Sequence, residues 1–202
     1  MNFLAHLHLA EATPESRMGN LLGDFVKGRP YDERFPPEIW KGIMEHRHID
    51  AFTDKHPVWQ MSRDRLPREL RRFAGIIIDI VYDHFLVRHW DRFSPRVSFS
   101  SFVEATHEDL LESLHLAPDD AAEVILMMMQ EEWLEGYASL KGIKETLRRV
   151  SGRSASLTPM HSAFSEVLPW MDEMEGHFLD YYPELLEYVD SMRSSTGKLP
   201  RA

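Results

Sequence analysis

Hydrophobic residues recur three or four positions apart along most of the chain, which is the period of an amphipathic α-helix. Alternating stretches rich in Val, Ile and Thr, which would indicate β-strands, are scarce. Helices are therefore predicted over residues 14–30, 35–57, 67–94, 98–114, 118–140, 141–151 and 158–193. We expect an all-α, single-domain helical bundle over residues 1–195, with a frayed tail over 196–202.

Composition narrows the class of protein. The net charge of -10 argues against general nucleic-acid binding, because a polyanion would be repelled. No segment is long and apolar enough for a membrane span, and the opening apolar stretch has no basic region before it, so a signal peptide is not expected. The absence of cysteine excludes disulfides and thiolate metal sites and agrees with a reducing cytoplasm. We expect a cytoplasmic protein with neither nucleic acid nor membrane as a partner.

Histidines concentrate in the first half of the chain. Seven of the eleven lie within the first 89 residues, with aspartates between them. In the opening segment MNFLAHLHLA, His6 and His8 share a face only if the segment is extended. A lone histidine on an apolar face is more often a core residue than a ligand. We expect His6 to approach a site and His8 to support it or lie in the core.

The predicted helix over 35–57 carries polar residues four positions apart. His46, Asp50 and Asp54 fall on one face, while other positions of the same segment are strongly apolar. A solvated polar face explains this spacing as well as a functional site does.

The predicted helix over 67–94 gives a sharper signal. Asp79 and Asp83 lie four apart with His84 beside them, and the surrounding isoleucines and other apolar residues indicate a helix buried on nearly all sides. Buried carboxylates are costly unless a cation or hydrogen-bond donors compensate them. Arginines such as Arg47 or Arg88 could pair with them, but a metal ion explains the whole set more simply.

A third polar pair, Asn20 and Asp24, repeats the spacing of four in the helix predicted over 14–30. Alone it is a weak signal, because such residues are common caps. The combined set of His and Asp residues indicates an oxygen-and-imidazole site for one or two divalent metals: His6, Asp24, His46, Asp50, Asp79, Asp83 and His84. Hydrolysis of a phosphate ester is the usual chemistry of such a site.

Four separated motifs resemble the acyl carrier protein phosphodiesterase family: MNFLAHLHLA, GNLLGDFVKG, FPPEIWKGIMEHRHIDAFTD and DIVYDHFLVRHW. The resemblance implies an all-helical fold from a divergent branch of the HD-type metal-dependent phosphohydrolases. It also implies hydrolysis of the phosphodiester that joins 4'-phosphopantetheine to a serine of holo acyl carrier protein, by a metal-activated water. The implied metal is Mn²⁺, with Mg²⁺ or Fe²⁺ also possible. One departure is His48, where the family often carries arginine.

The motifs suggest a role for each polar residue. As metal ligands we expect Asp24, His46, Asp83 and His84, with His6 and Asp79 next. As catalytic residues we expect Asp50 or Asp79 to orient or deprotonate water, Arg47 to hold the phosphate and His89 to protonate the leaving group. Asn20 is expected to contact the substrate.

An arginine run offers a docking surface for an acidic carrier protein. The stretch RDRLPRELRR holds Arg63, Arg65, Arg68, Arg71 and Arg72 against two carboxylates, a local balance of +3. A solvated charged face explains the same residues equally well. A second basic group, which is a weaker candidate, comprises Lys141, Lys144, Arg148 and Arg149.

Two alternatives remain open from the sequence. One is a metal phosphohydrolase of nucleotides or other small phosphodiesters, and the other is a non-catalytic module that binds a carrier protein. The oligomeric state is not indicated by any feature of the sequence.

Overall fold

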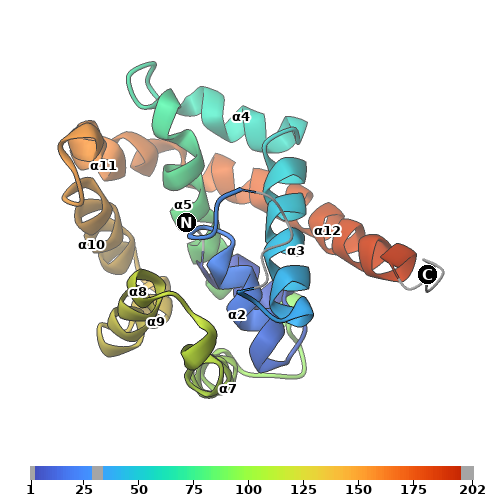
Figure 1. Ribbon diagram of the computed structural model, residues 1–202. Helices are drawn as coiled ribbons and strands as arrows, with labels where there is room; N and C mark the ends of the chain where they lie inside the picture. Colours follow the sequence, from blue (N-terminus) through green and yellow to red (C-terminus); the bar gives the residue numbers. More distant parts are fainter. Residues whose placement is uncertain (1–2, 29–33, 197–202) are drawn as a thin grey trace.

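The computed structural model describes residues 3–28 and 34–196, and within those ranges it contains α-helices and short 3₁₀ helices but no strand (Figure 1). The all-α prediction is therefore confirmed. The α-helices are α1 (Phe3–Leu9), α2 (Pro14–Leu22), α3 (Pro37–Thr53), α4 (Pro57–Arg65), α5 (Ala74–Arg88), α6 (Trp90–Phe93), α7 (Phe99–Glu112), α8 (Asp119–Gln130), α9 (Trp133–Gly136), α10 (Leu140–Ser151), α11 (Ala163–Val167) and α12 (Met171–Thr196). The 3₁₀ helices are η1 (Arg71–Phe73), η2 (Leu114–Leu116), η3 (Ala155–Ser162) and η4 (Leu168–Trp170).

The opening segment is helical, and this separates its two histidines. Positions two apart on an α-helix point to different sides, so His6 and His8 do not share a face. The next helix begins where Thr13 accepts a hydrogen bond from the Ser16 amide, with Pro14 at the first helical position.

Two glycines let α2 and α3 cross at close range. A Cβ atom on Gly19 would lie 2.5 Å from the Ile39 carbonyl oxygen, and one on Gly42 would lie 2.8 Å from the Gly19 Cα. Only glycine fits such a backbone-to-backbone contact. The crossing holds the end of α2 beside the middle of α3, where the site described below begins.

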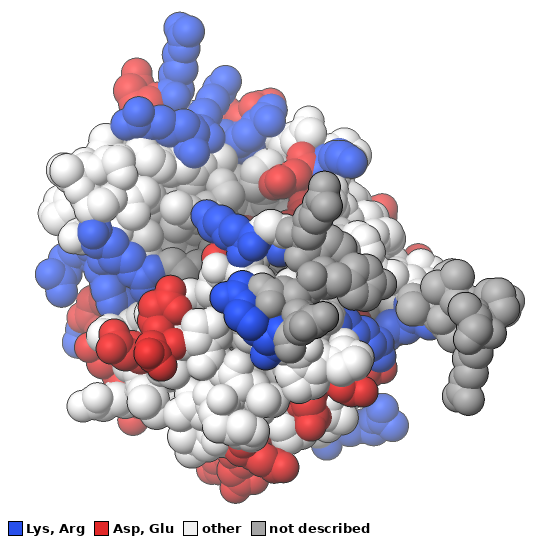
Figure 2. All heavy atoms as spheres, viewed as in Figure 1, with Lys and Arg blue, Asp and Glu red and all other residues white. Residues whose placement is uncertain are grey.

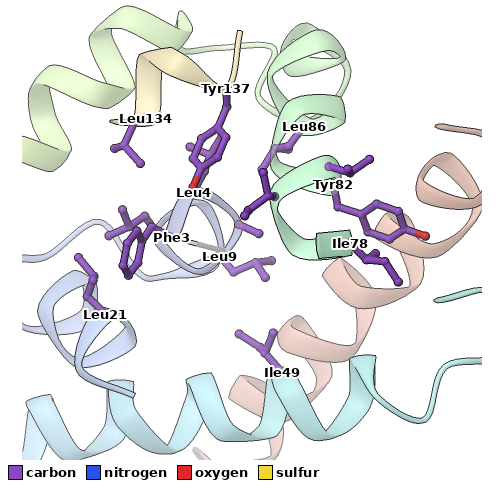
Figure 3. Packing of buried hydrophobic residues seen from close by; sticks show 14 of the residues in the cluster. Phe3, Leu4, Leu9, Leu21, Ile49, Ile78, Tyr82, Leu86, Leu134 and Tyr137 are labelled. Carbon is purple, nitrogen blue, oxygen red and sulfur yellow. The ribbon is translucent and has the colours of Figure 1, made fainter. Parts of the chain in front are cut away.

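Helix α5 is buried on most sides, as its apolar sequence predicted. Ile77, Ile78, Val81, Phe85 and Leu86 are all fully buried. The helix packs against α1, α4, α10 and α12. Figure 3 shows side chains of α5 and α1 in this core, together with Leu134 of α9 and Tyr137, which follows α9. A polar group on this helix is consequently removed from water unless it faces a cavity.

Several predicted boundaries are corrected. Helix α2 ends at Leu22, so Asp24 lies in the following turn and does not share a helical face with Asn20. The helix predicted from residue 67 begins at Ala74, after η1. The segment over 118–140 divides into α8 and α9, because Glu132 adopts a left-handed backbone with φ of 50°.

The other boundary changes are at the C-terminal side and at the edges of the described ranges. The helix predicted over 158–193 is divided: its first part forms η3, α11 and η4, and α12 begins at Met171. The predicted helix end at Pro30 and the predicted frayed tail beyond residue 196 lie outside the described residues. Among the helices described, none combines the length and the apolar character needed to cross a membrane.

Candidate metal centre

A cavity of about 120 Å³ opens between α1, the turn after α2, α3 and α5. Its lining is unusually rich in His and Asp: His6, Asp24, His46, Asp50, Thr53, Asp54, Gly75 and Asp79. Five of the seven residues of the predicted His/Asp set therefore meet here, from segments up to 73 positions apart in the chain.

At the centre of the site, the imidazoles of His6 and His46 both contact the carboxylate of Asp50. His6 Nε2 lies 3.2 Å from one oxygen of Asp50, and His46 Nε2 lies 3.1 Å from the other. The two imidazole rings stack with their centroids 3.9 Å apart. Both histidines are buried, whereas the Asp50 side chain is about half exposed at 54%. One possible ligand atom from each of the three residues lies within 4.8 Å of the others.

The protonation states favour cation binding. Burial, assisted by the neighbouring His46, lowers the pKa of His6 from 6.5 to about 4, so its imidazole is neutral at pH 7. Burial would raise the pKa of Asp50, but hydrogen bonds from His46 and His6 outweigh it and hold that pKa below its ordinary value. A neutral imidazole and an ionised carboxylate are the forms that bind a metal ion.

Further carboxylates surround this centre. Asp24 Oδ1 lies 3.9 Å from His46 Nε2. Burial raises the pKa of Asp79 to about 6, and the charges of Asp50 and Asp24 act in the same direction. Burial and the charge of Asp50 also raise the pKa of Asp54. These carboxylates repel one another, and a bound cation would relieve the repulsion.

The donor set fits a divalent transition metal. Imidazole nitrogen and carboxylate oxygen together suit Mn²⁺, Fe²⁺ or Zn²⁺. The Nδ1 atoms of His6 and His46 are buried without a hydrogen-bond partner, whereas each Nε2 donates to the Asp50 carboxylate, so without a metal the ring proton is held on Nε2. A bound cation would take the place of these two protons and would be held by both Nε2 atoms and Asp50.

Asp83 and His84, predicted as ligands, lie outside the lining of this cavity. Asp83 accepts hydrogen bonds from the Leu4 and Ala5 amides at 3.2 and 2.9 Å, and so satisfies backbone groups at the start of α1. His84 Nδ1 donates to the Tyr137 carbonyl over 2.7 Å. Burial raises the pKa of Asp83 well above its ordinary value. The structure gives both residues a role in joining helices.

Other residues with a predicted role also have internal partners and do not line the cavity. Arg47 donates to the Val26 and Gly28 carbonyls at 2.8 and 3.0 Å, and so holds the segment that follows Asp24. His89 Nε2 lies 2.6 Å from a carboxylate oxygen of Glu175.

Asn20, which is buried, and His8, which is partly buried, both have hydrogen-bond partners inside the protein. The Asn20 amide donates to the Ser16 carbonyl and to Glu45, over 3.1 and 3.3 Å. His8 lies between the Tyr182 and Ser94 hydroxyls, at 2.7 and 2.8 Å from its ring nitrogens. His8 is thus partly buried between two hydroxyl groups and does not line the cavity.

The arginine run spans the end of α4 and the segment before α5, and only some of its side chains have a carboxylate partner. Lys and Arg atoms gather over α4 and the segment that joins it to α5, at the top of Figure 2. Arg65 forms an ion pair with Glu173, and Arg63 pairs with Asp64. Arg71 donates only to the carbonyls of Leu66 and Asp64, so no carboxylate neutralises it in these contacts.

Arg68 and Arg72 complete the run. Both are exposed, and the Arg72 guanidinium lies 4.5 Å from the ring centroid of Phe73. Gly75, three positions after Arg72, lines the cavity. The exposed end of the run is thus close in sequence to the candidate metal centre.

Two lining residues were not predicted. Thr53 follows Asp50 by three positions on α3, and Gly75 precedes Asp79 by four on α5. Extending the same helical spacing from each aspartate would have found both.

Comparison with known proteins places these residues in context. The family model described as acyl carrier protein phosphodiesterase matches residues 1–185. The proteins of that name from Yersinia pestis and from Serratia proteamaculans are each 37% identical, over 92% and 93% of this chain and 96% of their own length. The protein of that name from Escherichia coli O6:H1 is 36% identical over 93% of this chain and 96% of its own length. No solved structure matches the chain.

Proposed function

The chain belongs to the acyl carrier protein phosphodiesterase family, and from that premise we propose that it hydrolyses the phosphodiester between 4'-phosphopantetheine and a serine of holo acyl carrier protein. Water adds across the phosphorus–serine oxygen bond: its hydroxyl goes to phosphorus and its proton to the serine oxygen. The products are apo acyl carrier protein and free 4'-phosphopantetheine.

The observation that carries this proposal is the convergence of His6, His46 and Asp50 on one cavity. These three residues would hold a divalent cation, with Asp24 as the nearest further ligand. We propose Mn²⁺, while Mg²⁺ and Fe²⁺ suit the oxygen donors as well. Such a cation supplies a water of lowered pKa and offsets the charge that develops on the phosphoryl oxygens.

Asp79 is the residue suited to moving the proton. A group with a pKa near the working pH is the most effective acid or base, and burial raises the pKa of Asp79 to about 6. It lines the cavity from α5, across from the histidines of α1 and α3. We propose that Asp79 takes the proton of the attacking water, and that Asp50 fixes the direction of both imidazoles.

The exposed arginines would orient the carrier protein. An acidic partner is attracted to a local positive patch even when the whole chain is negative. Arg68, Arg71 and Arg72 meet no carboxylate in the contacts described above, whereas Arg63 and Arg65 do. We therefore propose that the docking surface is centred on the three residues that precede α5.

The intact mass of holo acyl carrier protein tests the reaction. Incubation with this protein and Mn²⁺ is expected to convert holo to apo carrier protein, and the conversion is expected to stop in EDTA and in His46→Ala. An unchanged mass, in protein shown to contain the metal, would contradict the proposal. Turnover of a small phosphodiester alone would then indicate a different phosphohydrolase, and metal-loaded protein that binds carrier protein without turnover would indicate a binding module.

A further inference from the structure

Thr53 lines the cavity of the candidate metal centre from α3, and the contacts of its hydroxyl fix where its proton lies. Its Oγ1 lies 2.8 Å from the Ile49 carbonyl oxygen and 2.6 Å from the Tyr181 hydroxyl oxygen. A hydroxyl carries one proton and a carbonyl oxygen can only accept, so Thr53 donates to Ile49 and Tyr181 donates to Thr53. The Thr53 hydroxyl therefore has no proton left to donate and one lone pair left to accept with.

Tyr181 is held firmly beside Thr53. It is buried and belongs to α12, which packs against α3. Its ring meets the His56 ring edge to face with centroids 5.0 Å apart, and Phe52 of α3 stacks on Tyr188 of α12 with centroids 4.5 Å apart. These ring contacts fix the place of the phenol, and its hydrogen bond fixes the direction of the Thr53 hydroxyl.

Tyr181 also lies within electrostatic reach of the carboxylates of the cavity. Burial raises the pKa of its hydroxyl above the ordinary value, and the charges of Asp79 and Asp50 act in the same direction. The phenol therefore keeps its proton at neutral pH and remains the donor to Thr53. Because Thr53 follows Asp50 by three positions on α3, the two side chains occupy the same side of that helix.

The direction of these hydrogen bonds decides which molecule Thr53 can bind. The phosphoryl oxygens of a phosphodiester anion are acceptors, so they gain no hydrogen bond from a hydroxyl whose proton is already used. A water molecule donates through two O–H groups, and one of them can meet the remaining lone pair of Thr53. The position beside Thr53 therefore suits water and not phosphate.

We propose that Thr53 accepts a hydrogen bond from the attacking water, and that Tyr181 acts through Thr53 as a positioning residue. The inference rests on the proposed function for the reaction. As the water oxygen bonds to phosphorus, one of its protons passes to Asp79 and the other stays on that oxygen, directed at Thr53. With both O–H groups held, a lone pair of the water oxygen is directed at the phosphorus atom.

Steady-state kinetics with holo acyl carrier protein and Mn²⁺ test the Thr53 hydroxyl. Thr53→Val keeps the shape of the side chain and removes the hydroxyl, so it is expected to lower kcat about tenfold and leave KM unchanged. Thr53→Ser keeps the hydroxyl and is expected to recover most of kcat. An unchanged kcat in Thr53→Val, or a Thr53→Ser variant as slow as Thr53→Val, would overturn the proposal.

Two buried tyrosines test the part played by Tyr181. Tyr181→Phe is expected to lower kcat several-fold at unchanged KM. Tyr82→Phe is the matched control, because its hydroxyl is similarly buried and its partner Ser62, 2.8 Å away, does not line the cavity. In urea with EDTA, the shifts of the unfolding midpoint in Thr53→Val and Tyr181→Phe should not add, since both break the same hydrogen bond. Equal kcat in the two tyrosine variants, or additive shifts, would show that Tyr181 does not act through Thr53.

Calorimetric titration with sulfate separates water from anion as the molecule that Thr53 binds. Sulfate is a tetrahedral anion without an O–H group, so only a donor can form a hydrogen bond to it. In full-length protein, with Mn²⁺ and again in EDTA, Thr53→Val is expected to bind sulfate as wild type does. Sulfate binding several-fold weaker in Thr53→Val would mean that Thr53 donates to the anion, and would contradict its assignment to water.

A small phosphodiester, bis(p-nitrophenyl) phosphate, distinguishes failure of this inference from failure of the proposed function. If wild type hydrolyses it but not holo acyl carrier protein, the proposed function fails, and kcat of Thr53→Val and Thr53→Ser on the small diester decides the role of Thr53. If wild type hydrolyses carrier protein and Thr53→Val does so equally fast, only the present inference fails. Hydrolysis of neither substrate by Mn²⁺-loaded wild type would overturn both.

Discussion

Two sets of His and Asp side chains look alike in the sequence and differ in the structure. In the first, His6, His46 and Asp50 direct their polar atoms toward one another at a cavity. In the second, Asp83 accepts hydrogen bonds from backbone amides of α1, and His84 donates one to a backbone carbonyl in the segment after α9. The difference shows that hydrogen-bond partners, more than residue type or burial, distinguish a candidate ligand from a residue that joins helices.

The largest contrast is expected from removing one histidine of each set. His46→Ala should lose the bound metal and lower turnover about a hundredfold or more, because a direct ligand matters at least as much as its supporting residues. His84→Gln, which retains a hydrogen-bond donor, should keep the metal. Elemental analysis of the purified variants and the intact-mass assay measure both effects. Equal metal loss in the two variants would show that the α5 residues are ligands, as the sequence predicted.

Replacing an aspartate should destabilise the fold more in the second set than in the first. Asp83→Ala leaves two buried amides without an acceptor, at about 1–3 kcal/mol each, and should lower the free energy of unfolding by about 2–6 kcal/mol. Asp50→Ala should cost less stability, because its side chain is half exposed. Urea unfolding in EDTA separates these contributions from metal binding. A greater loss of stability in Asp50→Ala would reverse the comparison.

Without metal, the free energy of unfolding should also depend on pH through His6 of the first set. The pKa of His6 is about 4 in the folded protein and 6.5 when exposed, so between these values the unfolded chain binds more protons. The free energy of unfolding should therefore fall as the pH falls from 6.5 to 4, by about 3 kcal/mol more in wild type than in His6→Gln.

Comparing wild type with His6→Gln isolates the contribution of His6 to this pH dependence. The pKa of Asp79 is raised, which gives a pH dependence of the opposite sign, but Asp79 is present in both proteins and cancels in the difference. His48→Gln, at an exposed position of α3, is the control and should behave as wild type. Parallel curves for wild type and His6→Gln would mean that His6 titrates normally.

The smallest contrast concerns the arginine run. Arg68→Gln combined with Arg72→Gln should raise KM for carrier protein a few-fold at low salt, while Arg65→Gln should change it less because Glu173 already pairs with that residue. Added salt should remove the difference. Steady-state kinetics in two salt concentrations measure it, and equal effects in both variants would argue against docking at the exposed end.

The sequence predicted the helical fold because the 3.6-residue period is a local property that tertiary contacts rarely override over long segments. It predicted His46 and Asp50 together because both lie well inside α3. It misplaced Asp24 relative to Asn20, since a helix end is decided by a few residues and α2 ends at Leu22.

The partners of Asp83 could not be predicted in the same way. Asp79 and Asp83 share a face of α5, but the amides that bind Asp83 come from a segment 78 and 79 positions earlier. Spacing within one helix contains no information on which distant backbone groups meet it.

The contact between Asp83 and the start of α1 has a consequence for synthesis of the protein. A helix of seven residues does not persist by itself in water, so α1 depends on partners made much later. On the ribosome, His6 therefore leaves the exit tunnel long before its surroundings exist. The nascent chain can assemble the candidate metal centre only after α5 has emerged.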